Sequence, residues 1–288
     1  MLRRSIPNLF TIINLLCGTA GVILACSEQL LWAACLICAA AAADFLDGFC
    51  ARLLKVQSAM GKQLDSLADM VTFGVLPGVI LFQLITIGYG LYFVDIAQRG
   101  PGHLFAASLA LLVPVFAGLR LARFNVDESQ SHSFLGLPTP ANAVLIASFP
   151  LILEYQFRLN MYHPLRGDTL REMGRLFNWD ALEIFALGTL FSPGFYMVLS
   201  VVMALLMVAP MRFFSFKFKS FGWASNRIRY IFLAVILAAV VVVFLPYLRI
   251  SGLYYTFLDF IIIPILLFLY LILSVLNNLF KITDEVQS

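Results

Sequence analysis

Charged side chains are scarce in this sequence. Asp, Glu, Lys and Arg make up 12% of the 288 residues, whereas hydrophobic residues make up 61%. A soluble domain normally carries about a quarter charged residues. The deficit excludes an ordinary soluble domain and indicates an integral membrane protein. The formal net charge is only +3 and no basic run is present, so nothing in the sequence indicates a nucleic-acid partner.

Histidine and cysteine are too few and too dispersed to predict a zinc site or a redox centre. His103, His132 and His163 lie in separate predicted loops, where nothing pairs them with a base or a metal site. The five cysteines all fall within the first fifty residues, and the Cys35–Cys38 pair lacks a second pair. We therefore assign the histidines no role and interpret the cysteines as small buried thiols.

Long apolar runs are abundant instead. A membrane-spanning helix needs about 20 mostly apolar residues, and about eight segments meet this requirement. The predicted spans are 7–26, 29–52, 64–94, 104–124, 137–157, 183–210, 228–248 and 255–279. The third span contains Gly74, Pro77 and Gly78, which predict a kink or a tilt. The fold class is therefore an all-α integral membrane protein.

A basic and aromatic loop over 211–228 divides the predicted helices into two groups. Six spans precede it and two follow, which predicts a six-helix core in residues 1–220 and two additional C-terminal helices in 221–288. The segment 158–182 has an apolar face and predicts a short amphipathic helix on the outer membrane surface. An even number of spans places both termini on one side. Most of the 19 basic residues then fall on that side, which predicts a cytoplasmic N-terminus.

Four aspartates flank the turn between the second and third predicted spans. An uncompensated aspartate within a membrane costs several kcal/mol. At about 100° per residue, one face of the second helix carries two of them with small residues and a cation, and one face of the third carries the other two with a glycine. The first face holds Asp44, Asp47, Gly48, Ala51 and Arg52, and the second holds Gly61, Asp65 and Asp69. A predicted turn over 57–62 lets the two faces meet across a helical hairpin.

Carboxylates that face one another need a cationic partner. Arg52 supplies one positive charge. Oxygen ligands without histidine or cysteine suit hard divalent cations such as Mg2+ or Mn2+. Two ions held about 3.5–4 Å apart by shared carboxylates are a usual device for displacement at phosphorus. A carboxylate at the edge of such a cluster can accept the proton of an attacking hydroxyl.

The eight residues of the two faces form the pattern D-x2-D-G-x2-A-R-x8-G-x3-D-x3-D, with every fixed position filled. The chain thereby resembles the CDP-alcohol phosphatidyltransferase family. The resemblance implies a six-helix core, commonly a homodimer, that takes a CDP-linked lipid from the cytoplasmic leaflet, transfers its phosphatidyl group to a small alcohol and releases CMP. It also implies that the four aspartates are metal ligands, that Asp69 is the general base, and that Gly48, Ala51, Arg52 and Gly61 line the CDP pocket.

Four further stretches look like the serine-using, membrane-embedded members of this family. They are 6–18, 55–78, 119–125 and 136–143. The resemblance implies CDP-diacylglycerol and L-serine as substrates, phosphatidylserine as product, and a site at the cytoplasmic face of the cell membrane. It leaves open another acceptor, namely glycerol 3-phosphate, an inositol phosphate or choline. An ion-coupled transporter is a less favoured alternative. It would have paired repeats, broken helices and polar residues near the bilayer midplane, whereas here the aspartates cluster at the predicted cytoplasmic helix ends and have no counterpart in the second half.

Several polar residues have two interpretations. Arg120, Arg123 and Asn125 are candidates for binding the acceptor, because arginine suits carboxylate and phosphate groups, but the two arginines also suit snorkelling anchors. Asn8 and Thr11, placed at the N-terminus of the first helix, either bind the cytidine or diphosphate or simply cap the helix. Pro138 and Pro140 are expected to shape the start of the fifth span.

Overall fold

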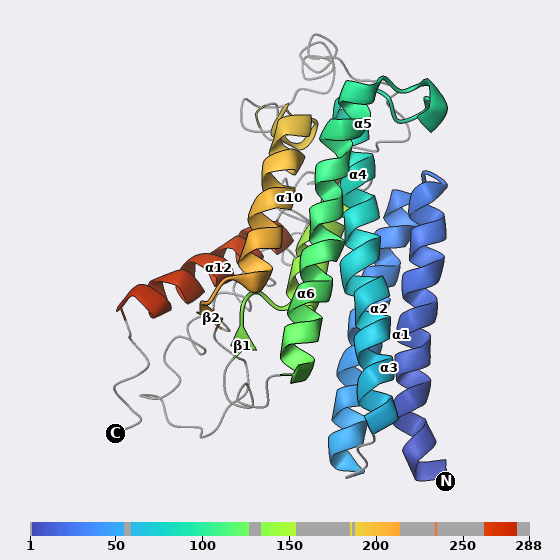
Figure 1. Cartoon of the computed structure of the whole chain (residues 1–288), viewed down its shortest axis with the longest axis vertical. Helices are drawn as coiled ribbons and strands as arrows, with labels where there is room; N and C mark the ends of the chain where they lie inside the picture. The colour runs from blue at the N-terminus through green and yellow to red at the C-terminus, as the bar shows by residue number, and fades with distance from the viewer. Residues whose placement is uncertain are drawn as a thin grey trace, which may run out of the picture.

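The computed structural model describes residues 2–54, 59–126, 134–153, 188–213 and 262–280, together with Phe185 and Ala234. The predicted span 228–248 lies outside these residues apart from Ala234, as do the segment 158–182 and most of the loop over 211–228. Within the described residues the chain is a bundle of helices (Figure 1), which confirms the predicted helical class.

The first two helices form a hairpin. α1 (Leu2–Cys26) and α2 (Leu30–Leu53) pack along each other and are joined by a short turn in which Glu28 has a φ of 64°. The hydroxyl of Tyr92 donates a hydrogen bond of 2.7 Å to the carbonyl oxygen of Glu28, so this left-handed turn is held from a distant loop.

The third predicted span is one helical run with an irregular middle. It consists of α3 (Ala59–Asp69), the π-helical segment η1 (Met70–Val75) and α4 (Leu76–Gly88). The irregularity includes Gly74 and ends just before α4, which has Pro77 in its first turn. The kink or tilt predicted from these residues stays a prediction. The run begins earlier and ends earlier than predicted. Residues 59–62 are helical rather than part of the turn, and the chain leaves the helix at Gly88 before Gly90, whose φ is 70°.

A second continuous run covers the fourth predicted span. A short 3-10 turn, η2 (Ile96–Gln98), leads to α5 (Pro101–Ser108), the 3-10 segment η3 (Leu109–Leu111) and α6 (Leu112–Val126). α6 packs against η1 and against α10 (Pro193–Val208). The helix predicted over 183–210 is interrupted at residues 191–192, since Pro193 lacks an N–H and starts a new helix.

The start of α7 (Thr139–Leu151) is tied to the end of α10. β1 (Phe134–Leu135) and β2 (Arg212–Phe213) form a two-residue antiparallel pair, and the amides of Gly136 and Leu137 donate to the carbonyl oxygens of Met211 and Leu206, both at 2.9 Å. Gly136 has a φ of 79°, and a Cβ at this position would collide with the carbonyl oxygen of Met207. Only glycine therefore fits this contact.

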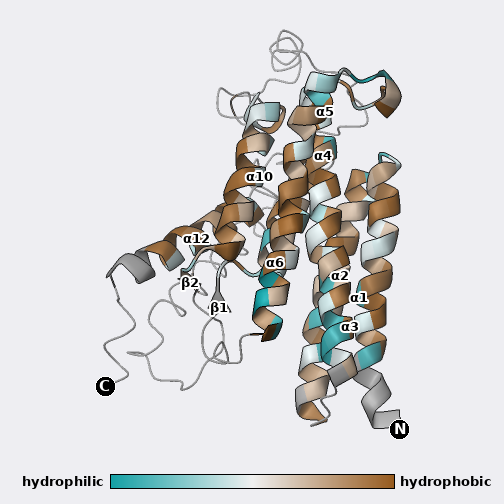
Figure 2. Cartoon of the chain, in the orientation of Figure 1, coloured by the Kyte–Doolittle hydropathy of each residue, from teal (hydrophilic) through white to brown (hydrophobic). Residues whose placement is uncertain are grey.

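Among the residues that the structure describes, four helical stretches are long and apolar enough to cross a membrane: Asn8–Cys26, Leu30–Ala51, Met60–Gly88 and Pro101–Val126. Figure 2 shows apolar colour along most of their length. α7, α10 and residues Ile263–Val275 of α12 (Ile262–Phe280) are shorter apolar helices. α12 contacts α7 and β2 and runs obliquely to the long helices (Figure 1).

Two glycines bring α1 close to the third helical run. A Cβ at Gly18 would collide with Thr72 of η1, and one at Gly21 would collide with Leu76 of α4. The absence of these side chains lets the two backbones approach. This contact places the polar residues of α1 against those of α3 and η1.

Candidate active site

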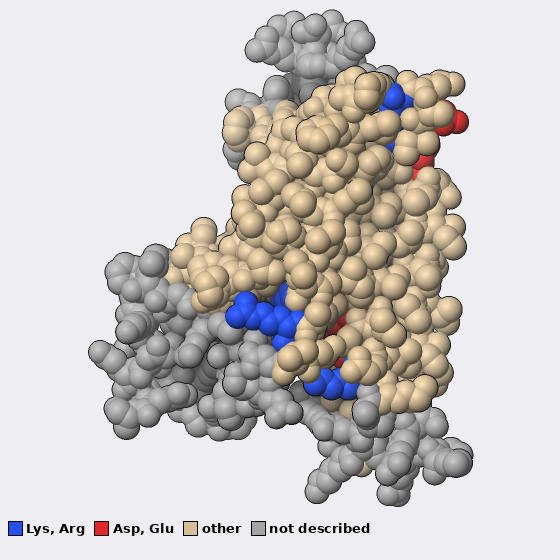
Figure 3. Space-filling view, viewed as in Figure 1, with Lys and Arg blue, Asp and Glu red and all other residues tan. Residues whose placement is uncertain are grey.

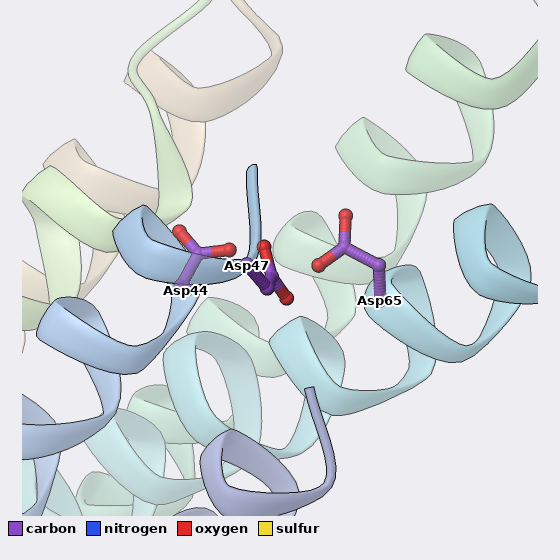
Figure 4. Close-up of side chains that lie close together, drawn as sticks. All are labelled: Asp44, Asp47 and Asp65. Atoms are coloured by element: carbon purple, nitrogen blue, oxygen red, sulfur yellow. The ribbon is translucent and has the colours of Figure 1, made fainter. Parts of the chain in front are cut away.

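Three of the four aspartates meet where α2 and α3 lie side by side. Asp44, Asp47 and Asp65 each offer a carboxylate oxygen within 4.8 Å of the others. Figure 4 shows the two carboxylates of α2 and the one of α3 converging on a common space. The predicted hairpin geometry is therefore confirmed for these three residues.

The fourth carboxylate lies one turn further along α3. Asp69 is not within the 4.8 Å group, but it interacts electrostatically with Asp44, Asp65 and Asp47. Its Oδ1 accepts a hydrogen bond of 3.1 Å from Nδ2 of Asn14. Asp69 thus stands at the edge of the cluster. Its role as the general base, which the family resemblance implies, stays a prediction.

α1 supplies two hydrogen-bond donors to the cluster. The hydroxyl of Thr11 donates to Oδ2 of Asp47 at 2.8 Å, and Asn14 donates to Asp69 as described. The prediction that Asn8 and Thr11 stand at a helix N-terminus is wrong, because α1 begins at Leu2 and both residues lie well inside it. Capping is therefore excluded for them.

Asn14 was not singled out from the sequence. A signal was present, because Asn8, Thr11 and Asn14 recur every three residues and so share one face of an otherwise apolar helix. The carbonyl oxygen of Asn14 also accepts a hydrogen bond of 3.0 Å from the hydroxyl of Thr72. Thr72 belongs to the π-helical segment that follows Asp69, and such segments often lie at functional sites.

The cluster has the donor set for a hard divalent cation. Asp47 is buried, and Oδ1 of Asp65 is buried without a hydrogen-bond partner among the described residues. A buried carboxylate oxygen without a partner is costly unless a cation approaches it. Oxygen ligands alone are the set that Mg2+ and Mn2+ prefer. The residues therefore fit such an ion.

The small residues predicted for the CDP pocket lie beside the cluster. A Cβ at Gly48 would meet nothing within 4 Å, so this side of α2 faces open space. Ala51 and Gly61 are half-buried, on α2 and in the first turn of α3. The backbone of Arg52 is helical, and its side chain lies outside the part of the chain that the structure describes.

The two arginines of α6 have different surroundings. Arg120 is buried, its Nη1 donates to the hydroxyl of Thr139 at 3.5 Å, and its guanidinium interacts electrostatically with Asp69. Arg123 is exposed. Nδ2 of Asn125 donates to the hydroxyl of Ser66 on α3 at 2.9 Å. Snorkelling therefore remains an interpretation for Arg123 but does not fit the buried Arg120.

The space-filling view shows where acidic and basic side chains reach one face of the molecule (Figure 3). On the lower part of the face in Figure 3, acidic atoms are visible in a recess bordered by basic side chains. The recess lies between the lower ends of the long helices of Figure 1. At this recess the acidic side chains could bind a cation, and the basic side chains could bind a negatively charged ligand.

The remaining predictions concern prolines and histidines. Pro138 precedes α7 and Pro140 stands in its first turn, which confirms that both shape the start of this helix. His103 lies in α5 rather than in a loop, and its ring packs against that of Tyr89 at 4.8 Å between centroids. His132 and His163 lie outside the described residues.

Comparison with known proteins agrees with the family resemblance of the sequence pattern in α2 and α3. A family model described as CDP-alcohol phosphatidyltransferase matches residues 4–179. The chain is 38% identical over 165 residues to a CDP-diacylglycerol–serine O-phosphatidyltransferase of Helicobacter pylori (strain J99), an alignment covering 57% of this chain and 62% of that protein. It is 33% identical to the protein of that name in Bacillus subtilis, over 51% of this chain and 79% of the relative. It is 31% identical to archaetidylserine synthase of Methanothermobacter thermautotrophicus, over 51% of this chain and 58% of that protein. The chain thus spans less than two thirds of the length of the Helicobacter relative.

Proposed function

This chain belongs to the CDP-alcohol phosphatidyltransferase family, and we propose that it transfers the phosphatidyl group of CDP-diacylglycerol to the hydroxyl of L-serine. The products are phosphatidylserine and CMP. The names of the Helicobacter and Bacillus relatives support serine as the acceptor. The observation that carries the proposal is the convergence of carboxylates from α2 and α3, with Asp69 at its edge interacting with the buried guanidinium of Arg120.

The aspartates are proposed to hold two divalent cations, Mg2+ or Mn2+, with Asp44, Asp47, Asp65 and Asp69 as ligands. Such ions, when bound, neutralise a diphosphate and stabilise the oxygen that leaves phosphorus. The hydrogen bond from Thr11 fixes the orientation of Asp47. We therefore propose that Thr11 orients this metal ligand. Its predicted contact with the cytidine or diphosphate stays a prediction.

Asp69 is proposed as the general base. The serine hydroxyl oxygen forms a bond to the phosphorus that carries the diacylglycerol group, and the bond from this phosphorus to the oxygen of CMP breaks. Asp69 accepts the hydroxyl proton. Asn14 supports this role, since its donated hydrogen bond to Oδ1 fixes the orientation of the carboxylate.

The nucleotide is proposed to lie along the open side of α2. Gly48 and Ala51 leave room for the CDP group, Gly61 admits it at the start of α3, and Arg52 and Asn8 contribute polar contacts. The open space at Gly48 supports this placement. The small side chains allow the diphosphate to approach the helix backbone.

The acceptor is proposed to bind at the end of α6. Arg120 pairs with the carboxylate of serine, with Arg123 and Asn125 at the outer side of this site. Arg120 is buried and interacts electrostatically with Asp69, and both observations support its assignment to the acceptor site. A guanidinium is suited to a carboxylate because it offers parallel N–H donors.

In the membrane, we propose the arrangement predicted from the sequence. It has eight spans, a catalytic core in residues 1–220, two further helices in 221–288, both termini and the active site at the cytoplasmic face, and a homodimeric assembly. The four long apolar helices support membrane integration. The basic residues of the predicted inner loops support the orientation.

The test is CMP release by the full chain purified in detergent and supplied with CDP-diacylglycerol and Mn2+ or Mg2+. L-serine, glycerol 3-phosphate, inositol 1-phosphate and choline are offered singly. CMP release is expected with L-serine and with none of the other three acceptors. Release with a different acceptor would keep the aspartate chemistry and refute the role of Arg120, whereas no release with any acceptor would refute the proposed function.

A further inference from the structure

The last helix carries two hydroxyl groups on its buried face. α12 is apolar except for Tyr270, Ser274 and the asparagines near its end. Tyr270 is 4% exposed and Ser274 is fully buried, and both lie on the same side of the helix, one turn apart. α12 contacts α7, whose first residue, Thr139, is the hydrogen-bond partner of Arg120.

The guanidinium of Arg120 has fewer hydrogen-bond partners than it has donors among the described residues. A guanidinium has five N–H donors. Its Nη1 makes one long hydrogen bond to Thr139, and its buried Nε has no partner among the described residues. A buried cation with unfilled donors is costly, so a dipolar group beside it, in addition to Asp69, would stabilise it.

Tyr270 is the group of α12 that lies near this cation. Its phenol is within electrostatic range of the Arg120 guanidinium, and Ser274 interacts with the same phenol. The guanidinium therefore has Asp69, Thr139 and Tyr270 around it, contributed by three different helical segments. The partial negative charge of the phenol oxygen favours a fixed orientation of the cation.

We propose that Tyr270 is a positioning residue that orients Arg120 toward the carboxylate of the acceptor. In this proposal Thr139 and Tyr270 hold the guanidinium, and its remaining N–H groups are left for the acceptor near Asp69, which accepts the proton of the acceptor hydroxyl. This inference rests on the proposed function.

The proposal gives the C-terminal segment a part in acceptor selection. Residues 4–179 match the family model, and α12 lies outside that range. A helix outside the matched region would thus set the geometry of the acceptor site. The residues of the family pattern lie in α2 and α3, where they are proposed to bind the CDP-linked substrate, and none of them lies in α12.

The experiment measures KM for serine and kcat in the full-length Tyr270→Phe protein. A hydrogen bond or close dipole at a charged group is worth enough to predict a roughly five- to tenfold rise in the KM for serine. The KM for CDP-diacylglycerol and kcat are expected to change less than about twofold, because the variant keeps the ring and its packing.

Two controls separate the hydroxyl from packing. Tyr196→Phe removes the hydroxyl of a fully buried tyrosine in α10 and is expected to match the unmodified protein. Leu271→Ala loosens α12 beside Tyr270 without touching the phenol. If Leu271→Ala raises the KM for serine as Tyr270→Phe does, the effect is one of packing and the proposal is overturned.

The outcomes also separate this proposal from the proposed function. Serine-dependent CMP release by the unmodified protein, with an unchanged KM for serine in Tyr270→Phe, overturns the positioning role alone. The absence of serine-dependent release by the unmodified protein overturns both. A raised KM for serine in Tyr270→Phe, with both controls near the unmodified value, supports the proposal.

Discussion

Replacing Thr11 with valine tests whether α1 controls the carboxylate cluster. The two side chains have nearly the same shape, so Thr11→Val removes the 2.8 Å hydrogen bond to Asp47 with little change in packing. Thr11 and Asp47 are both buried, with exposed fractions of 3% and 7%. Water therefore cannot readily replace the lost donor.

The size of the effect follows from these contacts. A hydrogen bond to a charged group contributes about 1.5–3 kcal/mol. Loss of a group that orients a metal ligand typically lowers metal affinity about 10- to 100-fold. We expect the Mn2+ concentration that gives half-maximal CMP release to rise by about this factor in Thr11→Val. The rate at saturating Mn2+ should fall much less, because the carboxylate itself remains.

The assay is a Mn2+ titration of CMP release at saturating CDP-diacylglycerol and serine. Thr19→Val is the matched control, since Thr19 is exposed on the same helix and its hydroxyl donates to a carbonyl oxygen of α1. Its titration should superimpose on that of the unmodified protein. If Thr11→Val gives an unchanged Mn2+ titration, Thr11 does not act on a metal ligand and the reasoning is refuted.

Three further predictions follow from the same structure. Asp69→Asn should lower kcat by about 10²–10⁴-fold with an unchanged melting temperature, and activity near the original value would remove Asp69 as the base. Gly136→Ala should lower the free energy of unfolding by about 1–3 kcal/mol, because the new Cβ meets the carbonyl oxygen of Met207 at a positive φ; a melting temperature equal to that of the unmodified protein would contradict this. Arg120→Lys should raise the KM for serine more than Arg123→Lys does, since only Arg120 is buried; equal effects would show that burial does not distinguish them.

The main features of the cluster were predictable from helical periodicity. Spacing of three and four residues placed Asp44 beside Asp47 and Asp65 beside Asp69, and the short connection made the two helices neighbours. Periodicity describes one helix at a time. It therefore gave no means of knowing that Asp65 joins the group of α2 while Asp69 stands at its edge beside Asn14.

Contacts between segments far apart in the sequence account for what was missed. Asn14 lies 55 residues from Asp69, and only tertiary packing brings them together. Arg120 and Arg123 look equivalent as an i, i+3 pair, but α7 covers one of them and leaves the other exposed. Helix ends were misplaced for a local reason, because apolar content does not reveal where Pro193 starts a new helix.

We propose above all that a metal-dependent carboxylate site transfers the phosphatidyl group of CDP-diacylglycerol to serine and releases CMP. The measurement that tests it most directly is CMP release by the full chain, first freed of divalent ions with a chelator and then titrated with Mn2+, with and without L-serine. We predict no release in the chelator, and release that rises with Mn2+ only when serine is present. Release that persists in the chelator, or that is the same without serine, would contradict the account.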